Sequence, residues 1–309
     1  MLIVSGPQSS GKTSTSALIT KRLEEQKGRT YVGHYFFPAN TKKSDEDKNP
    51  VQSALKYIAF QIARVDATVQ NALSKACDGG PAAFRRSASP ENLDILWGDL
   101  KIGVPGSGAT YYLVFDGLEN LPNKHTEMLL GFIFGPRLGG EVSGRVRVLV
   151  SGTDEQLSRW LAVDAALRIQ MEKQNGPDMR IVIDETLNKQ GMLQNVKTNS
   201  EQQKARNKIV EKLPQNVNGS YSLLQFGLGS VIRLLSTRTA IQELDRMLDQ
   251  SMSSHEAAIK NLQRSLTTDE ISELNELLKW VLFGNYSLTL DQLEAAMVSN
   301  SIWDLPEAD

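Results

Sequence analysis

The sequence predicts an α/β fold, with a parallel sheet and flanking helices, followed by a region of helices only. Short apolar runs alternate with helix-type patterns through residues 1–190, as a parallel sheet with helical crossovers requires. A glycine-rich loop separates the first apolar run from the first helical pattern. From Ala205 onward apolar residues recur at helical spacing, so we expect no further strands there.

Five apolar runs are expected to form the strands of the sheet. They are residues 2–4, 30–37, 111–115, 147–150 and a weaker run at 167–171. The first helix is expected over residues 13–26, and Pro50 opens the second, because proline is favoured in the first turn. The buried face of that second helix is predicted to be Val51, Leu55, Ile58 and Ile62. Another helix is expected around Trp97, and a polar connector at residues 189–203.

Composition limits the classes of function. The chain has 309 residues, enough for one to three domains, and 40% of them are apolar. A net charge of −2 gives no argument for nucleic acid or a membrane surface as a partner. Cys77 is the single cysteine, which excludes an internal disulfide and fits a reducing compartment. No apolar run approaches the ~20 residues of a membrane span, so we predict a cytoplasmic protein.

The loop after the first strand carries the most specific motif. Residues 6–13 read Gly-Pro-Gln-Ser-Ser-Gly-Lys-Thr and match G-x-x-x-x-G-K-[ST], the phosphate-binding P-loop. A strand, a glycine turn and a helix in succession aim backbone N–H groups and a helix N-terminus at one point, which attracts phosphate. We therefore predict a site for ATP or GTP. Its nucleotide-binding residues are expected to be Gly6, Pro7, Gln8, Ser9, Ser10, Gly11, Lys12, Thr13 and Ser14.

The chemistry of a triphosphate assigns roles within this loop. Gly6 and Gly11 let the backbone curl around the phosphates without a Cβ in the way. Lys12 is expected to reach the β- and γ-phosphates as a point charge. The hydroxyl of Thr13 is expected to ligate Mg²⁺.

Asp116 and Glu119 supply the second half of the predicted site. Asp116 ends the third strand, where a Walker B aspartate would hold Mg²⁺ together with Thr13. Capping of the next helix is the alternative role for such an aspartate. Glu119 is the best candidate to orient an attacking water, and a solvated loop carboxylate is the alternative. The predicted metal ligands are thus Thr13 and Asp116, and the predicted catalytic residues Lys12, Asp116 and Glu119.

Residues 113–121, Leu-Val-Phe-Asp-Gly-Leu-Glu-Asn-Leu, resemble the extended Walker B of NACHT-type STAND ATPases, apolar-D-G-L-D-E-L. These are the switch modules of NOD-like receptors and fungal incompatibility proteins. Other segments are similar to that family too. They are its aromatic second strand (35–37), its sensor-1 strand (147–151), its asparagine-to-aspartate turn (175–179), its G-x-F-L segment (219–224) and its winged-helix start (277–283 and 288–293).

The resemblance implies three parts and a switch. The parts are an NTPase domain at 1–190, a helical domain at 204–264 and a partial winged helix at 265–309. Nucleotide exchange or γ-phosphate hydrolysis would release a clamp between these parts and expose a surface for self-association or for other domains of a larger signalling protein. The P-loop begins five residues after the N-terminus, so we expect the chain to be truncated.

The sequence also departs from the family pattern. Asn120 replaces the second acid of Walker B, and the expected sensor-1 arginine is absent after Ser151, Arg159 being out of register. The family's later histidine contact to the β-phosphate is missing as well. Losing such contacts harms turnover more than binding, so we predict slow or absent hydrolysis, with weak NTPase activity at most.

Two other functions remain open at this level. A P-loop kinase acting on a small substrate would need an arginine-bearing lid, for which Arg85–Arg86 is the candidate. A degenerate, non-binding NTPase-fold interaction module would need no nucleotide. The guanine-reading N-K-x-D motif is incomplete, because Thr126 stands where its aspartate belongs. His34, His125 and His255 show no metal-ligand spacing.

Overall fold

The computed structural model describes most of the chain. The described residues are 1–39, 49–78, 97, 100, 102, 108–134, 145–157, 166–190, 201–236, 241–248, 259–260, 263, 266–283, 289–293 and 295. The loop at 103–107, the glycines at 79–80, Arg85–Arg86 and Arg159 lie outside them.

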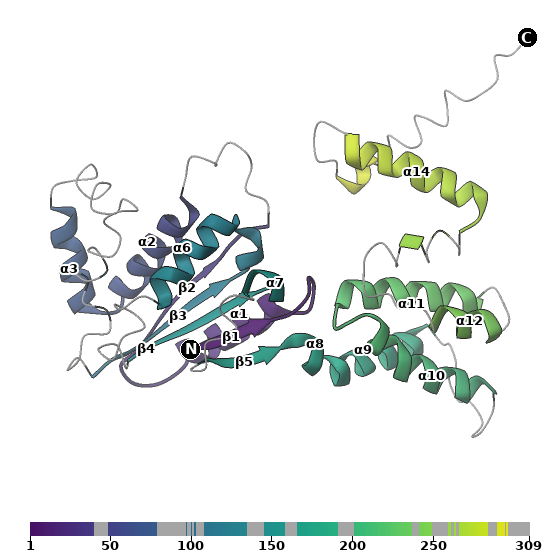
Figure 1. The fold of residues 1–309 in the computed structure, drawn as a ribbon, viewed down its shortest axis with the longest axis horizontal. Helices are drawn as coiled ribbons and strands as arrows, with labels where there is room; N and C mark the ends of the chain where they lie inside the picture. Colours follow the sequence, from purple (N-terminus) through teal and green to yellow (C-terminus); the bar gives the residue numbers. More distant parts are fainter. Residues whose placement is uncertain are drawn as a thin grey trace, which may run out of the picture. The chain divides into compact units, whose positions relative to one another are not determined.

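Within the described residues, five parallel strands form one sheet, as predicted (Figure 1). They are β1 (Leu2–Ser5), β2 (Thr30–Phe36), β3 (Thr110–Asp116), β4 (Val146–Gly152) and β5 (Leu167–Gln170). Their order is β2-β3-β4-β1-β5, so β4 lies between the strand that precedes the P-loop and the strand that ends at Asp116. This order brings the carboxyl ends of β1, β3 and β4 to one edge of the sheet.

Helices alternate with the strands in the first part of the chain and follow them in the second. The first set is α1 (Lys12–Glu24), α2 (Pro50–Ala63), α3 (Ala67–Cys77), the 3₁₀ turn η2 (Leu118–Asn120), α6 (Asn123–Phe134), α7 (Asp154–Leu157) and α8 (Met171–Gln174). The second set is α9 (Gly176–Lys189), α10 (Glu201–Asn216), α11 (Tyr221–Ser236), α12 (Ile241–Leu248) and α14 (Thr268–Phe283). The described residues after Ala205 contain helices and no strand, which confirms that prediction.

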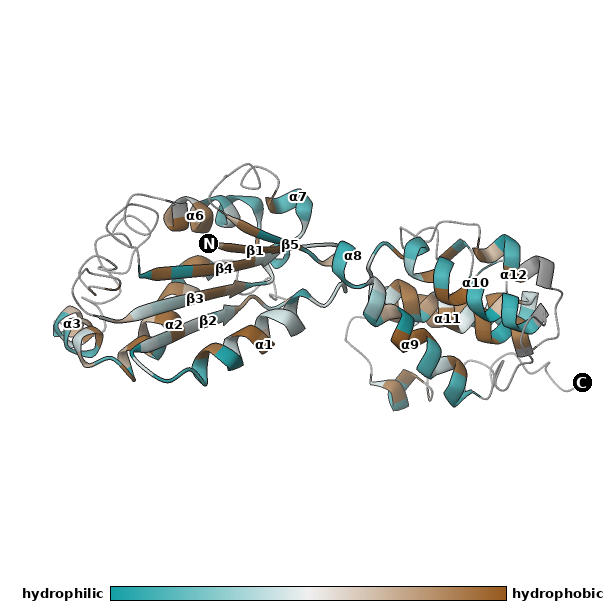
Figure 2. Ribbon diagram, turned by 90° about the horizontal axis from the view of Figure 1, so that it is seen from below, coloured by the Kyte–Doolittle hydropathy of each residue, from teal (hydrophilic) through white to brown (hydrophobic). Residues whose placement is uncertain are grey.

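Alternate residues of the strands pack on opposite faces of the sheet, as the pleat requires. Ile3 and Phe115 belong to a large core with the apolar faces of α2 and α6, while Val4 and Val114 belong to a smaller core with Ile19 of α1. Figure 2 shows the central strands β1 and β4 in the brown of apolar residues. Burial on both faces explains why these strands read as continuous apolar runs.

Helix α2 forms where the sequence predicts it. The side chain of Asn49 caps its N-terminus by accepting from the N–H groups of Val51 and Gln52. The four predicted face residues, Val51, Leu55, Ile58 and Ile62, are fully buried. This face lies so close to β2 that a Cβ on Gly33 would come within 2.5 Å of Ile58 Cγ2.

Gly33→Ala is expected to destabilise the protein by about 1–3 kcal/mol, because a filled core must shift to admit the added methyl group. The measurement is the free energy of unfolding in denaturant. Gly131→Ala is the matched control, since Gly131 lies in α6 with nothing within 4 Å of its Cβ position. Alanine at that helical site is expected to be neutral or stabilising. Equal effects of the two substitutions would contradict the packing argument.

By its internal contacts the chain divides into two units. The first is Met1–Val182 with Asn218–Ser222, and the second is Ile183–Val217 with Leu223–Asp309. Two of the three borders fall inside helices α9 and α11, and the third lies in the turn between α10 and α11. The division at residues 190, 204 and 265 that the sequence analysis drew stays a prediction.

The second unit has an apolar interior and a capped last helix. Its fully buried residues include Ile183, Leu187, Ile209, Leu213, Val217, Leu224 and Val231. Thr267 and Glu270 form a capping box at the start of α14. The hydrogen bond from Arg233, with those from Thr267, lowers the pKa of Glu270 to about 2. Leu278 and Val281 of α14 are exposed, although they belong to the helical apolar pattern expected after Ala205, because a periodic pattern marks a side of a helix but does not guarantee that anything covers it.

None of the helices in the described part of the chain has the length and apolar character needed to cross a bilayer.

Candidate nucleotide-binding site

The loop between β1 and α1 has the backbone conformation that its glycines allow. Gly6 and Gly11 have φ angles of 154° and 86°, which disfavour any residue with a Cβ. A Cβ on Gly6 would also lie 2.9 Å from Ser10 Oγ and 3.0 Å from Met171 Cβ. The loop therefore packs tightly against the start of α8 and delivers the chain into α1 at Lys12.

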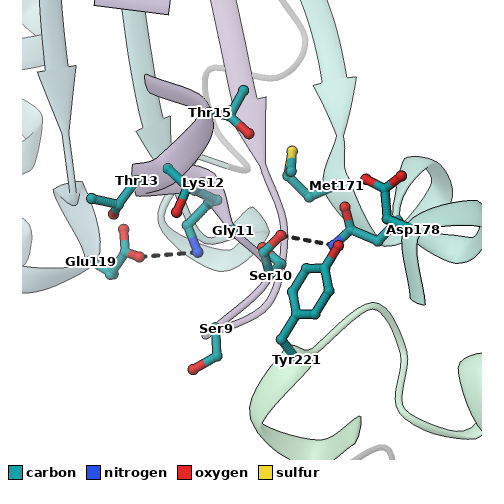
Figure 3. Close-up of a pocket in the computed structure, with 12 residues that line it drawn as sticks. Ser9, Ser10, Gly11, Lys12, Thr13, Thr15, Glu119, Met171, Asp178 and Tyr221 are labelled. Atoms are coloured by element: carbon teal, nitrogen blue, oxygen red, sulfur yellow. Dashed lines mark hydrogen bonds and ion pairs between the residues drawn. The ribbon is translucent and has the colours of Figure 1, made fainter. Parts of the chain in front are cut away.

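Lys12 is buried, and its ammonium has three acceptors. Nζ lies 3.2 Å from the Gly6 carbonyl oxygen, 2.9 Å from that of Pro7 and 3.0 Å from Glu119 Oε1. An ammonium has three N–H donors, so these contacts use its full capacity. Figure 3 shows Lys12 and Glu119 pointing toward one another across the loop end of the pocket. The two predicted catalytic side chains are thus brought together.

Asp116 is held between two hydroxyl groups. The Thr13 hydroxyl donates to Asp116 Oδ2 at 2.7 Å, and the Ser151 hydroxyl donates to Oδ1. Ser151 in turn accepts from the N–H of Gly117 at 3.1 Å. Ser151 stands at the end of β4, so the position of that strand between β1 and β3 fixes the orientation of the buried carboxylate.

The structure places Glu119 in the turn η2, directly after β3. Gly117 makes this turn possible with a φ of 80°, and a Cβ there would lie 3.0 Å from the Phe37 carbonyl oxygen. One carboxylate oxygen of Glu119 bonds Lys12, and the other is buried with no hydrogen-bond partner among the residues that the structure describes. An unsatisfied acceptor in a polar pocket is a place for a water molecule.

Asn120 has a structural role that the sequence did not reveal. Its amide donates to the Phe37 carbonyl oxygen at 2.8 Å, and the N–H of Phe37 donates to the Asp116 carbonyl oxygen at 2.8 Å. These bonds join the ends of β2 and β3. The side chain at this position therefore fixes the edge of the sheet beside the site.

A pocket of about 630 Å³ opens over the loop. It is lined by Ser9, Ser10, Gly11, Lys12, Thr13, Ser14, Thr15, Glu119, Met171, Asn175, Asp178 and Tyr221. The predicted residues Gly6, Pro7 and Gln8 belong to the loop but do not line the pocket, and neither does Asp116, which is buried and accepts a hydrogen bond from Thr13. That volume falls within the range of small-molecule sites.

The end of the pocket opposite Lys12 is formed by residues for which we predicted no individual role from the sequence. The buried amide of Asn175 donates to the carbonyl oxygens of Ser10 at 2.7 Å and Gly219 at 3.0 Å. The N–H of Tyr221 donates to the Ser9 carbonyl oxygen at 2.9 Å. Both contacts attach the P-loop to the segment that begins α11. In the sequence, the resemblance of residues 175–179 and 219–224 to NACHT segments was the available indication that these segments matter. It did not show that their side chains lie next to the P-loop.

The donor set at Thr13 and Asp116 fits Mg²⁺ that arrives with a nucleotide. Adjacent ligands of an octahedral Mg²⁺ are about 3.0 Å apart, given bonds of about 2.1 Å, and the Thr13 and Asp116 oxygens are 2.7 Å apart. Among the described residues, no cluster of three or more His, Cys, Asp or Glu could hold a metal. Magnesium sites of this kind take their remaining ligands from phosphates and water.

Comparison with known proteins supports a P-loop NTPase-like fold, but no particular family within that fold. Residues 1–153 match the family model described as nephrocystin 3, N-terminal. That segment includes the P-loop, Asp116, Glu119 and Ser151. The chain has a P-loop NTPase-like fold. The match gives no support for a NACHT or STAND assignment in particular.

The other two comparisons add little. No curated protein matches the chain. A solved structure described as "Structure of Drosophila ORC bound to DNA" is similar with a TM-score of 0.41 and 10% identity, over 99% of this chain and 77% of that chain. A likeness at that level carries no argument about ligand or partner, so the prediction of no nucleic-acid partner stays a prediction.

Proposed function

We propose that this chain binds a nucleoside triphosphate, ATP or GTP, with Mg²⁺, and that the bound nucleotide controls a molecular switch. The observation that carries the proposal is the convergence of Lys12, Thr13 and Asp116 at the P-loop. Strands β1 and β3 are not neighbours in the sheet, yet Thr13 and Asp116 are in hydrogen-bond contact. A lysine buried beside the pair supplies the positive charge that phosphates need.

Thr13 and Asp116 would hold the magnesium ion. When bound, the ion neutralises charge on the β- and γ-phosphates. Ser151 orients the Asp116 carboxylate through its hydroxyl, which leaves Oδ2 directed to Thr13. Lys12 would exchange its contacts with the Gly6 and Pro7 carbonyl oxygens for phosphate oxygens, because charged partners make stronger hydrogen bonds than neutral carbonyls do.

Hydrolysis is expected to be slow. Within the described part of the chain, Glu119 is the acid paired with Lys12 and so placed to accept a proton from water, and Asn120 is engaged with Phe37. Each missing transition-state contact costs about 2–4 kcal/mol, or 10²–10³ in rate. Turnover by the purified protein at ordinary NTPase rates would contradict this part of the proposal.

The switch part of the proposal draws on the attachment of the P-loop to the start of α11. Ser9 and Ser10 each accept a hydrogen bond from outside the loop, from Tyr221 and Asn175. Any change in loop conformation on nucleotide binding would alter these bonds. We propose that such a change regulates self-association or contact with other domains of a larger signalling protein, as the NACHT resemblance implies.

Thermal unfolding tests nucleotide binding directly. A ligand that binds only the folded state at 100 times its Kd stabilises it by about 2.7 kcal/mol, which corresponds to about 5–10 °C for a unit of this size. We expect Mg·ATP or Mg·GTP to raise the melting temperature by that amount. No shift with either nucleotide or with Mg·ADP, on cooperatively folded protein, would instead favour the non-binding interaction module.

A further inference from the structure

The pocket has two chemically different ends. Lys12, Thr13 and Glu119 stand at one end, and Met171, Asp178 and Tyr221 stand at the other. Figure 3 shows the two groups on opposite sides of Gly11. The loop end is suited to phosphates, so the question is what the far end accepts.

Tyr221 is fixed against the P-loop by its own backbone. Its N–H donates to the Ser9 carbonyl oxygen at 2.9 Å. Its Cε2 atom lies 3.6 Å from the position that a Cβ on Gly11 would take, and the Met171 methyl group lies 3.8 Å from the same point. An aromatic ring and a thioether therefore flank the loop at the point where α1 begins.

The charge at this end opposes phosphate. Asp178 is the ionisable carboxylate of the far end, and the pocket's lysine is at the opposite end, 3.0 Å from Glu119. Burial, reinforced by the negative charge of Asp178, raises the pKa of the Tyr221 hydroxyl, so the ring is neutral at pH 7. An uncharged flat group that carries hydrogen-bond donors matches these surroundings, because carboxylates only accept.

We propose that Met171, Asp178 and Tyr221 form a nucleoside subsite in which the base stacks on Tyr221 and a donor group of the nucleoside bonds Asp178. The inference rests on the proposed nucleotide function and names the residues that would recognise the part of the ligand beyond its phosphates. The donor for Asp178 is a base N–H or a ribose hydroxyl. Guanine presents two adjacent N–H donors on one edge, whereas adenine presents a donor beside an acceptor.

The first experiment compares nucleotides with inorganic tripolyphosphate, each with Mg²⁺, by calorimetry on the full chain. Tyr221→Ala is expected to weaken Mg·NTP binding about 5- to 150-fold, the range for loss of base–aromatic stacking, while tripolyphosphate binding is unchanged. Tyr221→Phe keeps the ring and is expected to bind like the wild type. Circular dichroism and the melting temperature without ligand confirm that each variant folds.

The outcomes separate the two proposals. If the wild type binds neither tripolyphosphate nor a nucleotide, the proposed function fails. If Tyr221→Ala weakens tripolyphosphate and nucleotide equally, or weakens neither, nucleotide binding stands and the stacking subsite is overturned.

The second experiment tests Asp178 with GTP, ATP and 2′-deoxy-GTP. Asp178→Ala is expected to weaken GTP binding about tenfold or more, as for hydrogen bonds to charged groups. A loss confined to GTP and its deoxy form identifies the guanine edge as the donor, and a loss for GTP and ATP but not deoxy-GTP identifies the ribose 2′-hydroxyl. Glu185→Ala is the matched control, an exposed acid on the same helix outside the pocket. Equal affinities of the Asp178 and Glu185 variants for all three nucleotides would overturn the role of Asp178.

Discussion

Lys12→Met is expected to weaken binding of Mg·ATP or Mg·GTP on the order of 100-fold or more, because each hydrogen bond to a charged group contributes about 1.5–3 kcal/mol and Lys12 would contact two phosphates. Methionine keeps an unbranched apolar stem in the buried channel and removes the charge. The effect is read from Kd by calorimetry. It is the largest effect expected from one substitution, because no other cation lines the pocket within the described residues.

Lys21→Met is the matched control for that variant. Lys21 is exposed in the last turn of the same helix. Its substitution therefore changes the net charge by the same amount without altering the pocket. The melting temperature without nucleotide shows whether freeing the Gly6 and Pro7 carbonyls harms the fold. Similar nucleotide affinities for the two variants would remove Lys12 from the binding site and with it the main support for a nucleotide function.

Asp116→Asn is expected to abolish the contribution of Mg²⁺ to nucleotide binding. The wild type should bind nucleotide more tightly with Mg²⁺ than with EDTA, whereas the variant should bind equally in both. The amide still has an oxygen to accept from one hydroxyl and an N–H₂ to donate to the other, so the bonds to Thr13 and Ser151 can be rearranged rather than lost. What disappears is the negative charge that Mg²⁺ requires.

Glu119→Gln distinguishes the role of the Glu119 carboxylate from that of Asp116. It makes the same change of charge three residues further on, but Glu119 bonds Lys12 and not Thr13. We expect this variant to keep the Mg²⁺ dependence of binding and to lose residual hydrolysis. Loss of Mg²⁺ dependence in the Glu119 variant, or its retention in the Asp116 variant, would reverse the assigned roles.

The P-loop, the strands and the buried face of α2 could be predicted from sequence because each depends on local spacing. Residues 6–13 match a motif whose phosphate-binding chemistry follows from the backbone conformations open to glycine and from a lysine at a fixed position in the motif. Asp116 was identifiable because it ends an apolar run. Val51, Leu55, Ile58 and Ile62 recur at helical period, and their full burial confirms the pattern.

The tertiary structure alone decided how distant segments complete the site. Ser151 orients Asp116 because β4 lies between β1 and β3, and strand order is not encoded in any local pattern. Asn175 and Tyr221 reach the P-loop from segments more than 160 residues away. Sequence periodicity describes contacts within one element. Which polar side chain satisfies a loop carbonyl, and which ring closes a pocket, depends on how separate elements pack, and that is set by the free energy of the whole core.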